Sequence, residues 1–172
     1  AVHWEGYEGI ATWRECFKAD DYDDLVAMQH GLLQADYYQV GIRRVGDLYV
    51  AAETVFFMGN PLKLDFGQSP NGLCHTRLAC SHNGFNWHHP RGRPAWLELG
   101  VPGEPDSGFH VTANTWVDHG DDMYMYYYGA GPQHGFCIRP DFSIDPTISL
   151  EEQRNMGRIL LARQKRDRFA SL

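Results

Sequence analysis

The sequence places one carboxylate, Glu53, inside a segment that is otherwise apolar, Tyr49 to Val55. A lone carboxylate on a buried strand is costly unless it is paired, and burial raises its pKa. A carboxyl group that stays protonated at neutral pH is what general-acid catalysis needs. Glu53 is therefore a candidate catalytic acid. An ion pair with Arg43 or Arg44, on the preceding segment, is the structural alternative.

A second group of carboxylates stands just before Leu25 and consists of Asp20, Asp21, Asp23 and Asp24. Their oxygens would suit calcium, but the segment lacks the glycine and the terminal glutamate of an EF-hand loop. Acidic side chains also favour the start of a helix, and Leu25, Met28 and Leu32 share one helical face. We favour a solvated helix start over a calcium site. We expect no other cofactor and no metal centre.

Other chemistries find no support in the sequence. It contains neither a glycine-rich phosphate loop nor a GxSxG nucleophile motif. The cysteines at 16, 74, 80 and 137 have no CxxC spacing and no zinc-finger pairing with histidine. We therefore expect free thiols and a reducing compartment, the cytoplasm. A mature chain exported after cleavage would begin in the same way, so the sequence leaves export open.

The composition narrows the class of protein. The 172 residues carry a formal charge of −7, so nucleic acid is not an expected partner. No apolar run approaches the roughly 20 residues of a membrane helix, so a membrane is not expected either. The chain is rich in aromatic residues, with 18 glycines and 9 prolines, which is typical of all-β folds.

Strand-like segments fall into two successive sets. The first is Tyr37–Arg44, Leu48–Phe57, His75–Ser81 and Phe85–His88; the second is Phe109–Val117, Met123–Tyr128, Arg158–Arg163 and Phe169–Leu172. Gly46-Asp47 and Gly120-Asp121 supply turns, and a short helix is expected near Leu150. Corresponding points recur after about 70 residues, a pattern that predicts two four-stranded antiparallel blades of a propeller.

Residues 78–87, LACSHNGFNW, resemble a hairpin of the five-bladed β-propeller glycoside hydrolases, above all a poorly characterised group similar to families 32 and 43. Further matches follow in the family's order at 103–108, 122–135 and 166–172, and 13–23 resembles the segment before a blade. His82 and Arg168 depart from the family, which has Asp and Gly there. The resemblance covers nearly the whole chain and corresponds to the last blades only.

The resemblance implies a lead-in at 1–35, one blade at 36–95 and another at 96–172, as a single propeller-like domain or fragment. Two blades do not close a ring. The resemblance therefore also implies that another chain, or further copies of this one, complete the propeller.

In such propellers the innermost strand of each blade starts at the mouth of a central funnel, where acids meet the substrate. The resemblance thus makes Asp36 and Asp106, at equivalent points of the repeat, candidate catalytic residues beside Glu53. Glycoside cleavage needs two carboxylates about 5–10 Å apart. Asp also caps turns, which is the structural alternative.

The resemblance also makes His134 a candidate sugar contact, because it lies in the family's HG motif at the funnel rim. Trp116 and Tyr128 are candidates for stacking on sugar rings. The implied function is the binding or hydrolysis of a glycan or small sugar. The alternatives are a non-catalytic sugar-binding or structural propeller subunit and, more remotely, a small β-sandwich of unrelated function.

Overall fold

The computed structural model describes residues 15–59, 71–135, 146, 149–151, 156–166 and 168–169. Its elements are α1 (Asp21–Gln29), β1 (Gln34–Val45), β2 (Leu48–Met58), β3 (Gly72–Ser81), β4 (Ala95–Leu97), β5 (Phe109–His119), β6 (Asp122–Ala130) and β7 (Arg158–Lys165). No described helix is long and apolar enough to cross a membrane.

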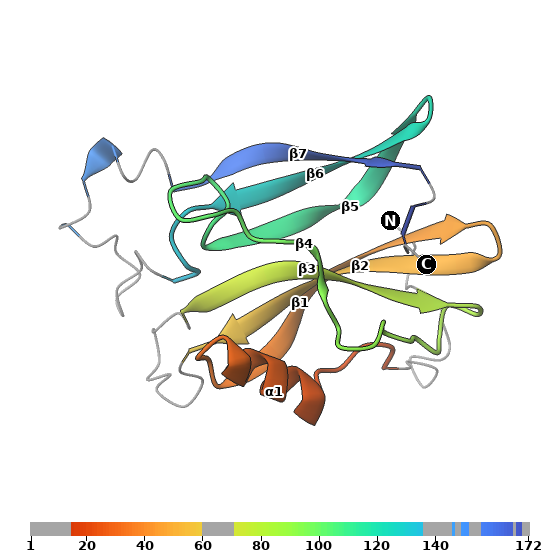
Figure 1. Ribbon diagram of the computed structural model, residues 1–172, viewed down its shortest axis with the longest axis horizontal. Coiled ribbons are helices and arrows are strands. Elements are labelled where there is room, and N and C mark those ends of the chain that lie inside the picture. The colour runs from red at the N-terminus through yellow and green to blue at the C-terminus, as the bar shows by residue number, and fades with distance from the viewer. Residues whose placement is uncertain are drawn as a thin grey trace, which may run out of the picture.

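The strands form two antiparallel groups that lie one above the other, with α1 beneath the lower group (Figure 1). The strand order is β1-β2-β3-β5-β6-β7, and β4 pairs with β3. One parallel pair, Cys74 with Phe109, joins the two groups. The expected all-β class is confirmed. The expected separation into two sheets is wrong at this junction, because the parallel pair joins all the strands into one seven-stranded sheet. For brevity we call β1–β4 the first sheet and β5–β7 the second sheet.

The repeat is visible in the two tight hairpins. Val45 pairs with Leu48 and His119 with Asp122, so each hairpin has a two-residue Gly-Asp loop. Gly46 and Gly120 both have φ +58°, which only glycine adopts readily. A glycine with positive φ at the first loop position is the signature of the type II′ turn, whose twist matches that of the strands.

The expected strand at Phe85–His88 is not formed. His88 makes only an isolated bridge with Cys80, and β4 is the described strand that pairs with β3 on that side. The side-chain oxygens of Ser81 and Asn83 accept backbone N–H bonds from residues 83–86. Such local bonds compete with a β ladder and hold the segment as a wide loop.

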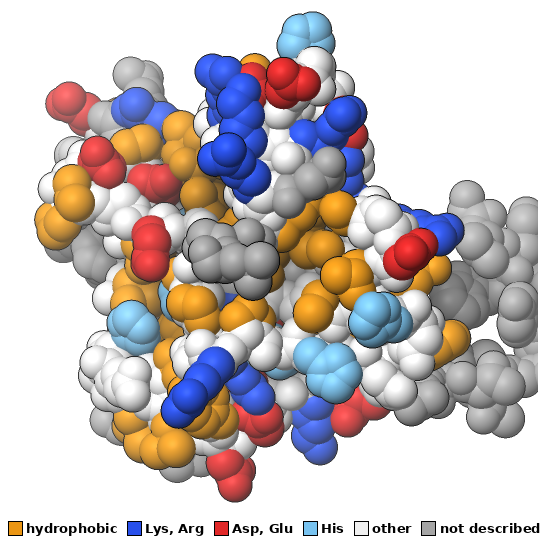
Figure 2. Space-filling view, turned by 45° about the vertical axis from the view of Figure 1, so that its right-hand side comes forward, with side chains coloured by type: hydrophobic (Ala, Val, Ile, Leu, Met, Phe, Trp, Pro, Cys, Tyr) orange, Lys and Arg blue, Asp and Glu red, His pale blue; other side chains and the backbone are white. Residues whose placement is uncertain are grey.

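Apolar side chains fill the space on both faces of β2. On one face, Val55 and Phe57 pack against Val26 and Ala27 of α1. On the other face, Val50 and Ala52 belong to a cluster that includes Trp96 and Trp116. In the space-filling view, hydrophobic side chains lie between the lower strand group, β1–β3, and the upper group, β5–β7. Lys and Arg side chains gather on the upper part of this view (Figure 2).

A buried ion-pair cluster fastens α1 to the first sheet. Asp20 caps the helix in a capping box with Asp23. The Asp23 carboxylate is fully buried and lies 2.8 Å from Nη2 of Arg77 on β3 and 2.6 Å from Nη1 of Arg93. The helix start is confirmed, but it is not simply solvated, because its third residue is a buried anion with two cationic partners.

Arg93 closes this cluster from the loop after β3. Its other contact is with Asp20, at 2.7 Å, and its guanidinium lies over the ring of Tyr22. Hydrogen bonds from Arg93 lower the pKa of Asp20 to about 2. Arg93 also has φ +46°, which is unfavourable for a residue other than glycine. We infer that the paired carboxylates hold this backbone in its strained conformation.

Three expectations fall outside the described residues, in whole or in part. These are the strand at Phe169–Leu172, of which only Phe169 is described, the helix near Leu150 beyond residue 151, and the thiol of Cys137. The boundary expected between residues 95 and 96 lies within β4, which belongs to the first sheet.

Replacing Asp23 with alanine leaves Arg77 buried without that carboxylate. We expect a loss of about 3–5 kcal/mol in the free energy of unfolding, measured by urea titration. Asp21→Ala is the matched control, because Asp21 is exposed in the same helical turn. It should cost less than about 1 kcal/mol. Equal losses for the two variants would contradict the role given to Asp23.

Candidate functional site

A β-bulge near the start of β1 positions the first residue of the site. Tyr37 pairs with Val55 and Gln39 with Thr54, so Tyr38 is the extra residue between them. A bulge re-aims the side chain of the extra residue. The Tyr38 ring stacks on Phe56, with centroids 5.1 Å apart, while about half of its surface stays exposed (49%).

Five aromatic rings meet around this bulge. The Oη of Tyr38 lies 2.7 Å from Nε2 of His134. The imidazole of His134 also contacts Phe56 and Phe109, at centroid distances of 4.9 and 5.7 Å. Phe109 in turn contacts Tyr128, at 5.6 Å. We call Tyr38, Phe56, Phe109, Tyr128 and His134 the aromatic cluster; it joins β1, β2, β5, β6 and the loop after β6.

His134 is held in place by backbone hydrogen bonds as well. Its N–H donates to the carbonyl of Gly72, and its carbonyl accepts from the Gly72 N–H. Burial raises the pKa of Tyr38, so its hydroxyl stays protonated at neutral pH. The cluster therefore presents a neutral phenol, an imidazole and the partly exposed rings of Tyr38 and Tyr128 on a fixed backbone.

Asp36 lies next to this cluster. It pairs across the strands with Phe56, so the two side chains share one face of the sheet. Asp36 is exposed, and its carboxylate accepts the backbone N–H of Tyr37 at 2.8 Å. That bond is local and leaves room for an external hydrogen-bond donor.

Asp106 lies in the turn before β5. Its carboxylate accepts a 2.8 Å hydrogen bond from Tyr127, whose side chain points to the opposite face of β6 from Tyr128. Burial and this hydrogen bond raise the pKa of Tyr127. Among the contacts of the described residues, none joins Asp106 to Asp36. The structure therefore ties Asp106 to β6, the partner of the strand that it precedes.

Glu53 is fully buried, as expected, but its partner is neither Arg43 nor Arg44. Nε2 of His89 lies 2.9 Å from Oε2 of Glu53. Arg43 instead pairs with Asp118 on β5, and Arg44 bonds the carbonyl of Gly46. The expected ion pair with an arginine is therefore wrong, and the partner of Glu53 is a histidine instead.

The Glu53–His89 pair extends into the ion-pair cluster through Tyr37. The hydroxyl of Tyr37 lies 3.2 Å from His89, accepts from Arg77 at 3.2 Å and donates to Asp23 at 3.3 Å. Successive residues of a strand alternate in direction, so Glu53 and Phe56 project from opposite faces of β2. Glu53 therefore belongs to a structural network on the face that α1 covers, away from the aromatic cluster.

Trp116 lies between the two sheets rather than at the aromatic cluster. Its ring packs on Trp96, at a centroid distance of 5.6 Å, and on Phe169, at 5.4 Å. Of the three aromatic candidates, the structure thus brings His134 and Tyr128 together and places Trp116 in the core.

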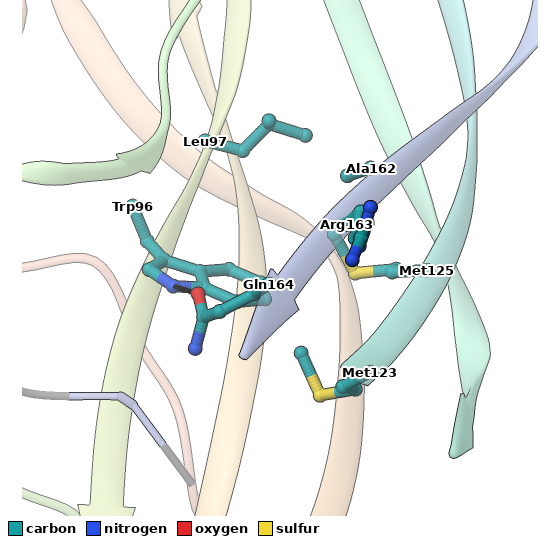
Figure 3. A pocket seen from close by; sticks show the side chains of 7 residues that line it. All are labelled: Trp96, Leu97, Met123, Met125, Ala162, Arg163 and Gln164. Atoms are coloured by element: carbon teal, nitrogen blue, oxygen red, sulfur yellow. Dashed lines mark hydrogen bonds between the residues drawn. The ribbon is translucent and has the colours of Figure 1, made fainter. Parts of the chain in front are cut away.

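A groove and a smaller cavity both border β6 and β7. A groove of about 270 Å³ is lined by Gln39, Val111, Thr112, Ala113, Tyr126, Tyr127, Tyr128 and Ile159. A smaller cavity of about 110 Å³ lies between β4 and the β6–β7 pair, where Trp96 Nε1 donates to Gln164 at 2.9 Å (Figure 3). The smaller cavity is lined largely by apolar groups, among them Met123 and Met125.

Two histidines are buried with ring nitrogens that lack hydrogen-bond partners among the described residues. Neither ring nitrogen of His110 has such a partner, and Nε2 of His75 has none. Burial lowers the pKa of His110 to about 4 and that of His75 to about 3. Both imidazoles are therefore neutral at pH 7.

No group of three or more His, Cys, Asp or Glu side chains in the described part of the chain is arranged to hold a metal ion. The carboxylates of 20–24 illustrate this. Asp20 and Asp23 pair with arginines, and Asp24 accepts the backbone N–H of Ala35 at 2.8 Å.

Sequence reasoning missed Tyr38, Phe56 and Phe109 at the site, and it missed His89 as the partner of Glu53. It also assigned no role to Arg77. The available signal for Arg77 was its position in an apolar strand, since a buried cation requires an anionic partner. For Tyr38 the sequence offered no signal, because the bulge depends on strand pairing.

No known protein family and no curated protein matches the chain. The solved structures that are similar to it include the following two. One, described as "Glycoside hydrolase", is 15% identical with a TM-score of 0.44, and the match covers 77% of this chain and 28% of that chain. The other, described as a BT0996 RGII complex, is 14% identical with a TM-score of 0.47, and the match covers 69% and 30%. This chain spans less than a third of the length of either structure.

The buried histidines predict how stability changes with pH. Because the folded chain binds protons at His75 and His110 more weakly than the unfolded chain, the unfolded chain is protonated first as the pH falls. The free energy of unfolding should be nearly independent of these histidines above about pH 7.5, where they are deprotonated in the unfolded chain as well. It should then fall by about 1 kcal/mol per pH unit for each histidine between pH 6.5 and 4.

His110→Phe tests this expectation, since it removes one titrating group and its unpartnered nitrogens. Denaturant titrations at several pH values should show a shallower acid loss and equal or higher stability at pH 7. His82→Phe, at an exposed position, is the control and should leave the slope unchanged. An unchanged slope in His110→Phe would show that His110 does not titrate in this way.

Proposed function

We propose that this protein binds a carbohydrate at the aromatic cluster, as part of a β-propeller related to glycoside hydrolase families 32 and 43. The observation that carries the proposal is the pairing of Tyr38, about half of which is exposed, with His134 among aromatic rings. The motif resemblance in the sequence supports it independently.

The chemistry of the cluster suits a sugar ring. A pyranose has apolar C–H faces that pack on aromatic rings, and hydroxyl groups that both donate and accept hydrogen bonds. Tyr and His carry an apolar body with a polar end, so they meet both needs. Asp36 adds an anionic acceptor beside Phe56, which strengthens a bond from a sugar hydroxyl.

Binding is favoured over hydrolysis by the positions of the acids. Hydrolysis needs a second carboxylate about 5–10 Å from the first, on the other side of the scissile bond. Glu53 is engaged with His89 on the opposite face of β2, and Asp106 is engaged with Tyr127. We propose Asp36 as the sugar-contacting acid and Asp106 as its partner only if a hydrolytic activity is found.

The rest of the proposal concerns the context of the chain. A closed propeller requires more sheets than the two described here, and another chain or further copies of this one would supply them. A reducing, cytoplasmic location is consistent with the buried thiol of Cys74, whose pKa is raised to about 12 by burial.

Tyr38→Ala removes the exposed ring and the hydrogen bond to His134. We expect it to weaken the binding of simple methyl glycosides about tenfold, which corresponds to about 1.4 kcal/mol, in calorimetric titrations against a panel of pyranosides and furanosides. Tyr128→Ala should have a similar effect, because it opens the other side of Phe109.

Tyr22→Ala is the matched control, since Tyr22 on α1 is a tyrosine of similar exposure outside the cluster. It should leave the affinity unchanged. The proposal fails if no glycoside of the panel binds the unaltered chain, or if Tyr22→Ala weakens binding as much as Tyr38→Ala. Incubation of the unaltered chain with aryl glycosides tests hydrolysis separately.

A further inference from the structure

We infer that Gly157, just before β7, is a positioning residue for the sugar site, because its lack of a side chain fixes where the ring of Tyr128 lies. The inference rests on the proposed function, since it concerns how the aromatic cluster meets a sugar. It makes a residue outside the five rings of the cluster a determinant of affinity.

Strand pairing brings Gly157 next to Tyr128. Tyr128 on β6 pairs with Ile159 on β7, and the two strands lie side by side (Figure 1). Gly157 comes two residues before Ile159, so it lies diagonally across from Tyr128. An aromatic side chain is long enough to reach a diagonal neighbour on the adjacent strand.

The tip of the Tyr128 side chain packs directly on Gly157. A Cβ atom at residue 157 would lie less than 3.0 Å from the hydroxyl oxygen and from two ring carbons of Tyr128, a separation that real Cβ atoms essentially never show. The φ of Gly157 is not positive, so the left-handed region is not the reason for glycine here. The requirement is one of space, at a point where the backbone is approached closely.

This contact holds the Tyr128 ring at a second point. Its first is Phe109, whose ring centroid is 5.6 Å away at an interplanar angle of 50°. The rest of the ring is accessible, since 39% of Tyr128 is exposed. A ring already held at two points loses little conformational freedom when a ligand packs on it, and such pre-organisation strengthens binding.

The same contact gives Tyr128 and Tyr38 different parts in recognition. The Tyr128 hydroxyl lies against Gly157, whereas the Tyr38 hydroxyl lies 2.7 Å from Nε2 of His134. Tyr128 thus offers a sugar its ring surface, which suits the C–H face of a pyranose. Hydrogen bonds to the sugar come from Tyr38, His134 and Asp36. Loss of the Tyr128 hydroxyl alone should therefore cost little affinity.

Gly157→Ala should move the ring without unfolding the chain. The atoms that the new methyl group would meet are at the far end of a partly exposed side chain. A change of rotamer carries that end into solvent and leaves the β6–β7 pairing in place. The ring of Tyr128 then leaves Phe109 and no longer completes the surface on which a sugar packs.

Calorimetric titration with the methyl glycoside panel tests the effect on affinity. We expect Gly157→Ala to weaken binding about tenfold, as Tyr128→Ala does. In the Tyr128→Ala background it should cause no further loss, because the ring that it displaces is absent. Tyr128→Phe should bind nearly as well as the unaltered chain. Gly131→Ala is the matched control, because its Cβ would make only ordinary contacts, the nearest at 3.5 Å.

A second measurement needs no ligand. Nuclear Overhauser effects between the ring protons of Tyr128 and Phe109 report on their contact in the free chain. They should be present in the unaltered chain and in Gly131→Ala, and lost in Gly157→Ala. Urea titration of each variant checks that it is folded.

The inference is overturned if Gly157→Ala keeps the ring contact between Tyr128 and Phe109. It is also overturned if folded Gly157→Ala loses that contact and still binds glycosides with full affinity, or if it weakens binding equally in the Tyr128→Ala background. Absence of glycoside binding by the unaltered chain would instead overturn the proposed function. The ring contact would still decide whether Gly157 positions Tyr128, so the two failures are distinguishable.

Discussion

The buried carboxylate of Asp23 is the constraint on which the arrangement of the first sheet depends. It joins the first turn of α1, the middle of β3 and the loop that carries Arg93. A buried ion pair contributes modestly to net stability, but loss of one partner is costly, so it favours one arrangement over others. Here it fixes where α1 lies on the sheet and holds Arg93 in a conformation that this residue rarely adopts.

This constraint divides the molecule into two sides with different roles. The α1 side contains Asp23, Arg77, Tyr37, Glu53 and His89, which satisfy one another within the fold. The opposite side of β2 leads to the aromatic cluster, where rings and polar atoms remain accessible. The bulge at Tyr38 makes this division possible, since it turns Tyr38 toward His134 while Tyr37 stays in the buried network.

Local features of the fold could be predicted from the sequence, and long-range pairings could not. The two Gly-Asp hairpins and the start of α1 depend on residues close together in the chain, and both are confirmed. The partner of Glu53 lies 36 positions away in the loop after β3, so no local pattern in the sequence marks it. The segment after Ser81 has the sequence of a hairpin, but side-chain oxygens accept hydrogen bonds from its backbone N–H groups, so the expected strand does not form. For the site, the sequence indicated His134 and Tyr128 but not the bulge that brings Tyr38 to them.

If a sugar binds at the aromatic cluster, the imidazole of His134 reports on it most directly, because this ring contacts Tyr38, Phe56 and Phe109. The measurement is NMR of the histidine ring resonances during titration with methyl glycosides, with His89 as an internal reference on the α1 side. Sugar binding at this cluster should produce a saturable shift of the His134 resonances and of the Tyr38 ring protons, while the His89 resonances stay constant. Binding that shifts His89 and leaves His134 unchanged, or the absence of any saturable shift, would contradict it.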